Sequence, residues 1–393
     1  MKKTKNIGLI CEFNPIHNGH KYLIDTIKKL NDPCRIICVM SGNYTQRGEP
    51  AIADKYTRAK WAITCGADAV FELILPFSLM SAEGFAYGAT SILDSLGNID
   101  ELWFGSESGN VSDLTKAAQI LESENFAREF KANSSTNNEY NYATLINNTL
   151  NEAFNFKMNG ANDLLGIEYI RSIKRLKSGI IPNTIKRVGV SHDAQTTSEF
   201  FASASNLRQM ILNGEHKKLG LYTVDPVSKH FIKNQAVRIE NNERGIIQKL
   251  REKIGEDNSI YINCNELGNK ICRESEKVKN LQELYFNVKT KNFTLARIRR
   301  AVLSIYLEIK KESSLNRPDH TKLLAINKNG MEYISENKKN RTIDIVIKAA
   351  KEKNNQGEMY KLNRNADRLY TLFYKDIQNR DLFLAVSPYV KPE

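Results

Sequence analysis

The 393-residue chain lacks any apolar run approaching the roughly 20 residues of a membrane-spanning helix, so we expect no membrane contact. Its first residues lead directly into an apolar segment without the cleavage site of a secretory signal, which predicts a cytoplasmic protein. None of its six cysteines forms a Cys-x-x-Cys pair, and several lie inside apolar runs. We therefore expect buried, reduced thiols and no protein metal site. Histidine is equally scarce, yet two of the six, His17 and His20, lie close together.

Acidic and basic residues are unevenly divided along the chain. Residues 1–216 hold 22 Lys and Arg against 23 Asp and Glu, whereas residues 217–393 hold 35 against 22. The whole formal surplus of +12 therefore belongs to the second half. Such an asymmetry favours a polyanionic partner for that half, although a solubilising surface accounts for the charge equally well.

The two histidines follow a strand-like run and precede a helical one. Residues 7–11 are apolar, Pro15 marks a turn, and residues 21–30 carry apolar side chains on one helical face. The start of a helix after a strand is a common anion site, because free N–H groups and the positive end of the helix dipole point there. Two imidazoles one turn apart can reach one phosphate group, and Gly19 lets a ligand approach the backbone. The alternative is a capped turn with two surface histidines.

Strand and helix patterns alternate through the first third of the chain. Strands are expected at residues 7–11, 35–40, 69–73, 101–104 and 185–190, helices at 18–30, 55–65, 82–96 and 164–176, and a loop at 133–141. Apolar strands separated by helices are typical of a parallel sheet covered on both faces, in which ligands bind beyond the carboxyl ends of the strands. From about residue 217 helical patterns dominate, with a short strand-like piece at 222–224. We expect an α/β domain at 1–216 and a mainly helical, basic domain at 217–393.

A second phosphate motif lies far downstream, where Ser203, Ser205 and Arg208 open a predicted helix. Together with His-x-Gly-His, this Ser-x-Ser-x-x-Arg pattern resembles the nucleotidyltransferase superfamily, whose second motif usually reads Ser-Ser/Thr-Thr-x-x-Arg. The resemblance implies a Rossmann-like catalytic domain that promotes attack at the α-phosphorus of a nucleoside triphosphate. Donors fixed in advance stabilise the charge that builds there, a role that suits His17 and His20. The two serines and the arginine would hold the β- and γ-phosphates.

Seven segments resemble one bacterial family in particular. They are residues 12–20, 40–50, 66–68, 104–107, 162–169, 185–187 and 203–208. The family is the tRNA(Met) cytidine acetate ligases, and the resemblance extends more loosely over the second half. It implies that ATP activates acetate as acetyl-adenylate, with Mg²⁺ expected beside the ATP. It further implies that the acetyl group passes to N4 of the wobble cytidine of elongator tRNA(Met), giving N4-acetylcytidine.

The resemblance also implies the residues of the ATP site. His17, His20 and Arg208 are expected to be catalytic. The expected ATP contacts are Ile10, Cys11, Glu12, Phe13, Asn14, Pro15, Ile16, His17, Asn18, Gly19, His20, Lys21, Tyr22, Leu23, Gly105, Asn162, Arg187, Ser203 and Ser205. Gly105 would admit the nucleotide next to the backbone, Asn162 would bond its base or ribose, and Arg187 would neutralise a phosphate.

Basic residues are the candidates for phosphate contacts with RNA, which give affinity without reading sequence. The candidates are Arg47, Arg297, Arg299, Arg300, Lys338 and Lys339. Arg47 would meet acetate or an RNA phosphate, or pair with Glu49. Two other functions remain open: a small-molecule adenylyltransferase acting on a phosphorylated cofactor precursor, and a non-catalytic RNA-binding protein. The sequence indicates no oligomeric state.

A few further residues have open chemical roles. Cys11 is a weak candidate for a nucleophile, because it ends a strand and has no evident paired base. Asp68 and Glu72 flank a predicted strand and would either bind Mg²⁺ or make structural hydrogen bonds. His192 and Asp193 suggest a loop that faces phosphate or RNA more than a metal site, because no third ligand is close in sequence.

Overall fold

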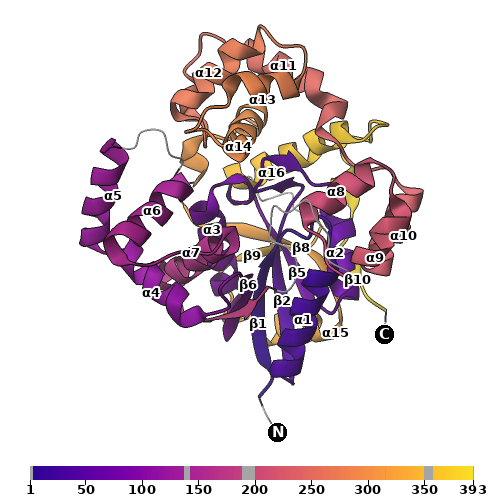
Figure 1. Ribbon diagram of the computed structural model, residues 1–393. Coiled ribbons are helices and arrows are strands. Elements are labelled where there is room, and N and C mark those ends of the chain that lie inside the picture. Colours follow the sequence, from indigo (N-terminus) through magenta and orange to yellow (C-terminus); the bar gives the residue numbers. More distant parts are fainter. Residues whose placement is uncertain (1–2, 137–141, 188–199, 315, 349–356, 393) are drawn as a thin grey trace.

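A single sheet with helices on both faces forms the centre of the molecule (Figure 1). The computed structural model describes residues 3–136, 142–187, 200–314, 316–348 and 357–392. Helices between residues 243 and 306 form a separate lobe beyond the carboxyl ends of the parallel strands. Within the described ranges, no helix is both long and apolar enough to cross a membrane.

Five parallel strands from the first half form most of the sheet. They are β1 (Lys5–Cys11), β2 (Cys34–Ser41), β5 (Ala69–Leu73), β6 (Glu101–Ser106) and β7 (Ile181–Lys186). Their order across the sheet is β5–β2–β1–β6–β7, and every neighbouring pair is parallel. All five carboxyl ends therefore meet at one edge, where ligands bind in sheets of this kind.

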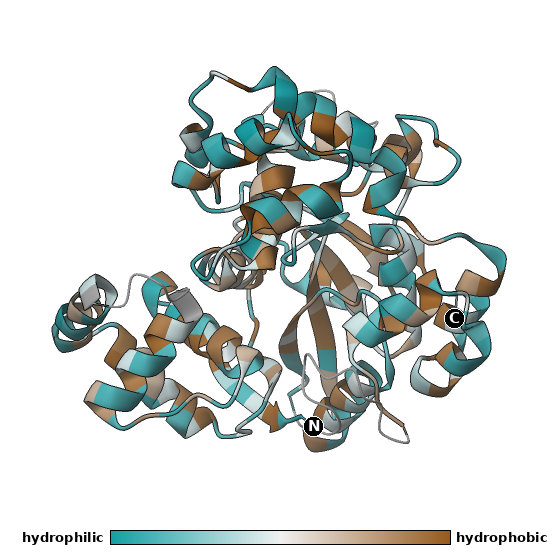
Figure 2. Ribbon diagram, turned by 45° about the horizontal axis from the view of Figure 1, so that its top comes forward, coloured by the Kyte–Doolittle hydropathy of each residue, from teal (hydrophilic) through white to brown (hydrophobic). Residues whose placement is uncertain are grey.

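Helices cover both faces because the strands are apolar on both sides. On one face, α1 (Asn18–Leu30) and α2 (Lys55–Thr64) pack over Leu9 and Cys38. On the other, α3 (Ala82–Leu96) and α7 (Ala161–Leu176) pack over Val39 and Phe71. Three helices extend this second layer: α4 (Val111–Leu121), α5 (Glu124–Thr136) and α6 (Tyr142–Phe154). Figure 2 shows the strands as mostly hydrophobic ribbons, whereas the outer helices carry both colours.

Helices follow one another from residue 204 into the second half, where the sequence predicts them. They are α8 (Ala204–Leu212), α9 (His216–Tyr222), α10 (Asp225–Lys233), α11 (Glu243–Glu252), α12 (Asn265–Ser275), α13 (Leu281–Val288) and α14 (Leu295–Tyr306). The chain then returns to the sheet, where β8 (His320–Ile326) pairs antiparallel with β5. Two short strands, β9 (Asp344–Val346) and β10 (Tyr389–Val390), pair with β8. The division at residue 216 stays a prediction, but both halves contribute to one sheet.

Three helices complete the C-terminal part: α15 (Lys328–Glu336), α16 (Glu358–Tyr370) and α17 (Leu382–Ala385). The sequence prediction did not include β8, whose first residues are polar although the whole strand is buried. The helix α16 lies over the carboxyl ends of β2 and β5, and its Asn363 side chain hydrogen-bonds the backbone of Leu75 in both directions. The last part of the chain thus holds the loops at the ligand-binding edge.

Most predicted elements of the first half are confirmed, and α1 and β5 have the predicted bounds. Three expectations were wrong. The strand expected at 185–190 begins earlier, as β7, because residues 181–186 pair with β6, and residues 188–190 lie outside the described part. Residues 222–224 are not a strand but the junction of α9 and α10. Of the loop expected at 133–141, residues 133–136 are helical instead, and residues 137–141 lie outside the described part.

Candidate active site

His17 and His20 together cap helix α1. His17 is the N-cap residue, and its Nδ1 accepts a hydrogen bond from the Gly19 N–H at 3.1 Å. The His17 N–H donates to Nδ1 of His20 at 3.3 Å. The two rings are stacked, with centroids 3.7 Å apart. Because each Nδ1 acts as an acceptor, the proton of each neutral imidazole lies on Nε2.

The surroundings of His20 keep its ring neutral. Burial, the neighbouring His17 and the positive charge of Arg187, in that order, lower the pKa of His20 well below its ordinary value. The stacked pair therefore offers Nε2–H donors at the end of α1 where the helix also presents its free N–H groups and positive dipole. This arrangement suits the oxygens of a phosphate group and needs no charged histidine.

Other residues of the predicted ATP segment at 10–23 divide between core and surface. The side chains of Ile10, Phe13 and Ile16 are buried in the hydrophobic cores, so they can serve a ligand only through their backbone. Tyr22 is exposed on α1. The Asn18 side chain donates to two backbone carbonyls, at 3.2 and 3.0 Å, and ties the start of α1 to the segment around α8 and α9.

The second motif reaches the first one from helix α8. Ser203 is the N-cap of α8, and its Oγ accepts a hydrogen bond from the N–H three residues later at 3.1 Å. Arg208 donates from Nη1 to the Asn14 carbonyl at 2.9 Å and from Nη2 to Ser205 Oγ at 3.2 Å. Arg47 donates to the same Ser205 Oγ at 2.9 Å. Two guanidinium groups therefore converge on one hydroxyl beside the loop that leads to His17.

Gly105, Asn162 and Arg187 meet at the carboxyl ends of β6 and β7. A Cβ at residue 105 would lie 3.3 Å from Cγ of Arg187, so the glycine leaves room for that side chain. Asn162, in the first turn of α7, donates from Nδ2 to Glu107 at 2.6 Å, and Glu107 also accepts from the Asp163 N–H at 2.8 Å. Burial lowers the pKa of Arg187, and the charge of Glu107 opposes this effect. Since Arg187 also acts on the pKa of His20, this edge adjoins the histidine pair.

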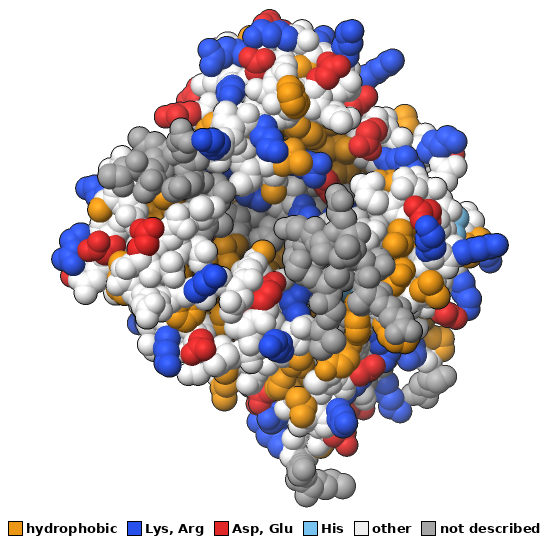
Figure 3. Space-filling view, in the orientation of Figure 1, with side chains coloured by type: hydrophobic (Ala, Val, Ile, Leu, Met, Phe, Trp, Pro, Cys, Tyr) orange, Lys and Arg blue, Asp and Glu red, His pale blue; other side chains and the backbone are white. Residues whose placement is uncertain are grey.

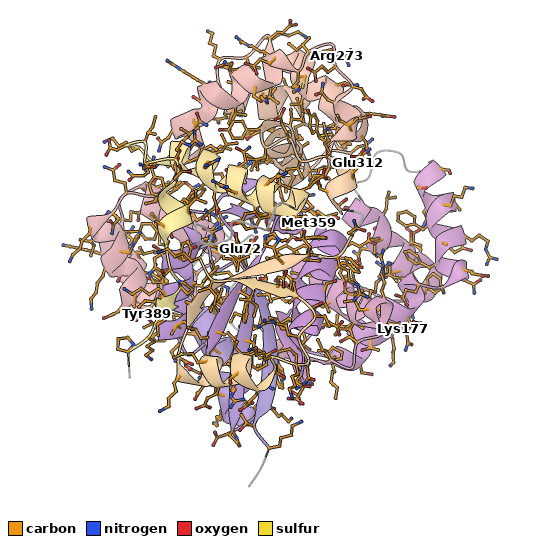
Figure 4. All side chains as sticks on the ribbon, turned by 180° about the vertical axis from the view of Figure 1, so that it is seen from behind. Glu72, Lys177, Arg273, Glu312, Met359 and Tyr389 are labelled. Atoms are coloured by element: carbon orange, nitrogen blue, oxygen red, sulfur yellow. The ribbon has the colours of Figure 1, made fainter. Side chains whose placement is uncertain are left out.

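A buried ion cluster supports the loop that carries Arg47, and no local sequence pattern indicates it. Lys55 Nζ lies 2.7 Å from Glu72 and 2.7 Å from Asp367 of α16. Burial opposes the charge of Lys55, but the two carboxylates outweigh it and raise its pKa. Figure 4 shows Glu72 near the centre of the molecule, below the helix that carries Met359. The partners lie too far apart in sequence for any local pattern to connect them.

A second buried cation, Arg58 of α2, holds the same loop through backbone contacts. Its guanidinium donates to the Ala53 carbonyl at 2.9 Å, to the Ser41 carbonyl at 3.1 Å, and to the carbonyls of Glu12 and Gly42. The Arg58 side chain is fully buried, and burial lowers its pKa. It ties the ends of β1 and β2 together beside the site, a role that its position within a helical pattern did not suggest.

The candidate Mg²⁺ ligands make structural bonds instead. Asp68 accepts from the Ile36 N–H at 2.8 Å and from Asn327 Nδ2 at 2.8 Å, and Glu72 is paired with Lys55. In the part of the chain that the structure describes, no group of three His, Cys, Asp or Glu residues is arranged to hold a metal ion.

Cys11 has the environment of an inert thiol. It ends β1, and its Sγ lies 3.8 Å from the Val39 carbonyl. Burial, with a smaller effect of the adjacent Cys38, raises the pKa of Cys11 well above its ordinary value. A thiol that stays protonated is a poor nucleophile, so Cys11 is a packing residue at the base of the site.

The arginines of α14 face the same loop as Arg208. Arg299 forms an ion pair with Glu49, which lies on the small hairpin of β3 (Tyr44–Thr45) and β4 (Glu49–Pro50). Arg300 donates to the Gln46 carbonyl at 3.1 Å, and burial lowers its pKa to about 10. Arg297 stacks on Phe293, with its guanidinium carbon 4.9 Å from the ring centroid. The fold thus brings the second half of the chain against the first at this hairpin.

Lys338 and Lys339 do not lie near the β3–β4 hairpin. They are exposed after the end of α15, and the adjacent Asn340 lies against Gly97, just before the amino end of β6. This is the edge of the sheet opposite the histidine pair. His192 and Asp193 fall outside the described residues, so their expected role stays a prediction.

The cap of α1, the α8 motif and the parallel sheet beneath them define a nucleotidyltransferase-type enzyme. A model of the family HIGH Nucleotidyl Transferase matches residues 4–382. The tRNA(Met) cytidine acetate ligase of Thermoanaerobacter sp. (strain X514) is 37% identical over 387 residues, covering 94% of this chain and 96% of that protein. Its namesake from Caldanaerobacter subterraneus subsp. tengcongensis is 34% identical over 393 residues, covering 96% and 98%. The chain therefore belongs to the tRNA(Met) cytidine acetate ligase family of enzymes.

Solved structures agree with this assignment. A crystal structure of Thermotoga maritima TmcAL bound with alpha-thio ATP matches with a TM-score of 0.88 and 27% identity, covering 98% of this chain and 99% of that chain. The apo form of the same protein matches with a TM-score of 0.91 and 26% identity over the same shares. The predicted α/β, nucleotidyltransferase-type fold is confirmed.

Proposed function

We propose that this enzyme activates acetate with ATP and acetylates N4 of the wobble cytidine of elongator tRNA(Met), giving N4-acetylcytidine. The observation that carries the proposal is the stacked pair of His17 and His20 at the start of α1, next to the loop whose Asn14 carbonyl is held by Arg208. Relatives named for this ligase activity support it, as does the alpha-thio ATP bound to Thermotoga maritima TmcAL.

In the first step, a carboxylate oxygen of acetate attacks the α-phosphorus of ATP. The new O–P bond creates acetyl-adenylate, while the bond from the α-phosphorus to the bridging oxygen breaks and pyrophosphate leaves with its electron pair. No proton is transferred, which matches two neutral histidines acting as donors only. Negative charge builds on the α-phosphate oxygens in the transition state, and one fixed donor of this kind contributes about 10²–10³ in rate.

The remaining predicted contacts are proposed to hold the rest of the nucleotide. Arg208, with Ser203 and Ser205, would bind the β- and γ-phosphates, because a planar guanidinium matches phosphate oxygens. Asn162, in the first turn of α7, would bind the base or the ribose, and Arg187, just after β7, would neutralise a phosphate. The histidine pair would bind the α-phosphate. Arg208 holds the Asn14 carbonyl in the loop before His17, and Arg187 is close enough to His20 to lower its pKa.

In the second step, the cytidine N4 attacks the acetyl carbonyl carbon. A C–N bond forms, the C–O bond to the adenylate phosphate breaks, AMP leaves, and the amine gives up one proton. The exocyclic amine is a weak nucleophile, so a mixed anhydride is a suitable acetyl donor. Arg47, Arg297, Arg299 and Arg300 are the proposed contacts for RNA phosphates near the site, whereas Lys338 and Lys339 would meet only a distant part of the tRNA.

The test is mass analysis of nucleosides from unmodified elongator tRNA(Met) incubated with the protein, Mg-ATP and isotope-labelled acetate. Labelled N4-acetylcytidine at the wobble position is expected, and reactions without ATP serve as the control. Unmodified tRNA with ATP still converted to AMP and pyrophosphate would point to another acceptor. Absence of both reactions in folded protein would overturn the proposal.

A further inference from the structure

A large cavity is lined by Arg208 and by the two serines of the second motif, Ser203 and Ser205. Its volume is about 560 Å³, within the range typical of ligand pockets. The walls come from the β3–β4 hairpin, from α8, from the segment at 237–240 and from Arg299 of α14. Both halves of the chain therefore build it. Figure 3 shows this face of the molecule hollowed below the lobe of α11–α14.

The lining of the cavity is partly apolar and partly cationic. Of its apolar residues, Pro50 and Val237 are buried, and Leu212 at the end of α8 is half-buried. Its cationic residues are Arg47, Arg208, Arg238 and Arg299. Bases taken out of a single strand are held by flat apolar or guanidinium surfaces, and their phosphates by arginine. This combination suits one nucleotide of single-stranded RNA better than a small anion, which would need no apolar wall.

Glu49 is the residue of the cavity that can discriminate between bases. It projects from the β3–β4 hairpin, pairs with Arg299 through one oxygen, and has its other oxygen 4.0 Å from Arg208 Nε. Its side chain is only 24% exposed, whereas the second carboxylate of the cavity, Glu240, is on an exposed residue. A carboxylate only accepts hydrogen bonds, so it fits the exocyclic amine of cytosine and rejects the O4 of uracil.

The cavity and the site of acetate activation share a wall. Arg208 lines the cavity and also donates to the Asn14 carbonyl in the loop that leads to His17. Ser205, which both Arg47 and Arg208 contact, lines it as well. A base seated in the cavity would therefore lie next to the nucleotide rather than across the molecule from it.

We propose that this cavity is the acceptor pocket, which takes a cytidine splayed out of an RNA loop, with Glu49 as the residue that selects its amine. The inference rests on the proposed function and names where that function's RNA substrate enters. Arg47 and Arg299 would hold the flanking phosphates, and the apolar wall would support the face of the base.

The first experiment fills the cavity at Leu212, a lining residue that is not among the proposed ATP contacts. Leu212→Trp places an indole in the cavity, and Leu30→Trp, at a 62% exposed position near the end of α1, is the matched control. Two rates are measured in each: acetate-dependent ATP–pyrophosphate exchange and acetylation of tRNA(Met). For Leu212→Trp we expect exchange within about two-fold of the wild type and tRNA acetylation at least ten-fold lower, with Leu30→Trp unchanged in both.

Parallel loss of both rates in Leu212→Trp would mean that the cavity belongs to the nucleotide site, and unchanged acetylation would mean that cytidine enters elsewhere. Either result would overturn the inference. Failure of the proposed function would be distinguishable from both results, because the wild-type protein itself would then acetylate no tRNA.

The second experiment tests the role of Glu49 by binding alone. Anticodon stem-loops that differ only in a wobble cytidine or uridine are titrated against the wild type, Glu49→Gln and Glu240→Gln. The wild type should prefer the cytidine loop by about ten-fold, the value of one good base-edge contact. Glu49→Gln should abolish the preference, because an amide can also donate to O4, and Glu240→Gln should keep it. A preference that survives in Glu49→Gln would refute the assignment.

Discussion

Replacing His20 by alanine removes both roles that this side chain has. Its Nδ1 accepts from the His17 N–H and completes the cap of α1, whereas its Nε2–H is the proposed donor to the α-phosphate. Loss of the cap costs about 1 kcal/mol of the free energy of unfolding. Loss of one fixed donor to a developing negative charge costs about 10²–10³ in rate. His20→Ala should therefore be slightly less stable than the wild type and severely slowed in acetate-dependent ATP–pyrophosphate exchange.

His20→Gln is the control that distinguishes these contributions. Glutamine is a usual residue at this position of a capping box, so it should restore the free energy of unfolding measured in urea. It lacks the rigid ring that sets Nε2 beside His17, and exchange should remain at least ten-fold below the wild-type rate. Full recovery of exchange in His20→Gln would show that the histidine acts only as a cap. Normal exchange in His20→Ala would refute the catalytic role outright.

The remaining predictions concern Arg208, Lys55 and the titration of His20. A lysine in place of Arg208 cannot contact the Asn14 carbonyl and Ser205 at the same time, so the KM for ATP of Arg208→Lys in the exchange assay should rise about ten-fold. An unchanged KM would contradict the proposal that Arg208 binds the β- and γ-phosphates. Lys55→Ala leaves the two buried carboxylates without their cation. It should therefore lower the free energy of unfolding by about 3–5 kcal/mol in urea titrations. A loss below about 1 kcal/mol would argue against the ion cluster. The pKa of His20 is lowered in the folded state, so the unfolded chain binds the proton first as the pH falls. Neutral His20 therefore contributes fully to the free energy of unfolding above its unfolded-state pKa of about 6.5, and this contribution is lost as the pH falls. Between about pH 7.5 and pH 5.5, the free energy of unfolding of the wild type should therefore fall more than that of His20→Gln. Equal losses would mean that His20 is not held neutral.

Local patterns in the sequence predict the parts of the site that follow from neighbouring residues. An apolar strand, a turn and an amphipathic helix place His17 and His20 at the start of α1, and the structure has that helix with the predicted bounds. The Ser203 cap of α8 follows from the same kind of pattern. In both cases the residues that determine the element are adjacent in the chain.

Long-range contacts of single polar residues could not be predicted in this way. Lys55 lies in an ordinary helical pattern, and nothing near it indicates pairing with Asp367 more than 300 residues later. The strand β8 was missed for a related reason. It begins with His320 and includes Lys322, yet it is buried between β5 and the short strands β9 and β10. Tertiary burial, rather than local composition, determines both.

The most direct test of the central claim is to follow the oxygen atoms of acetate. Attack of a carboxylate oxygen on the α-phosphorus leaves that oxygen on AMP when the acetyl group moves to cytidine. With acetate labelled by ¹⁸O in both positions, mass spectrometry should find one ¹⁸O in each AMP formed and none in pyrophosphate. Label in pyrophosphate or phosphate, or AMP without label while acetylcytidine accumulates, would contradict activation as acetyl-adenylate.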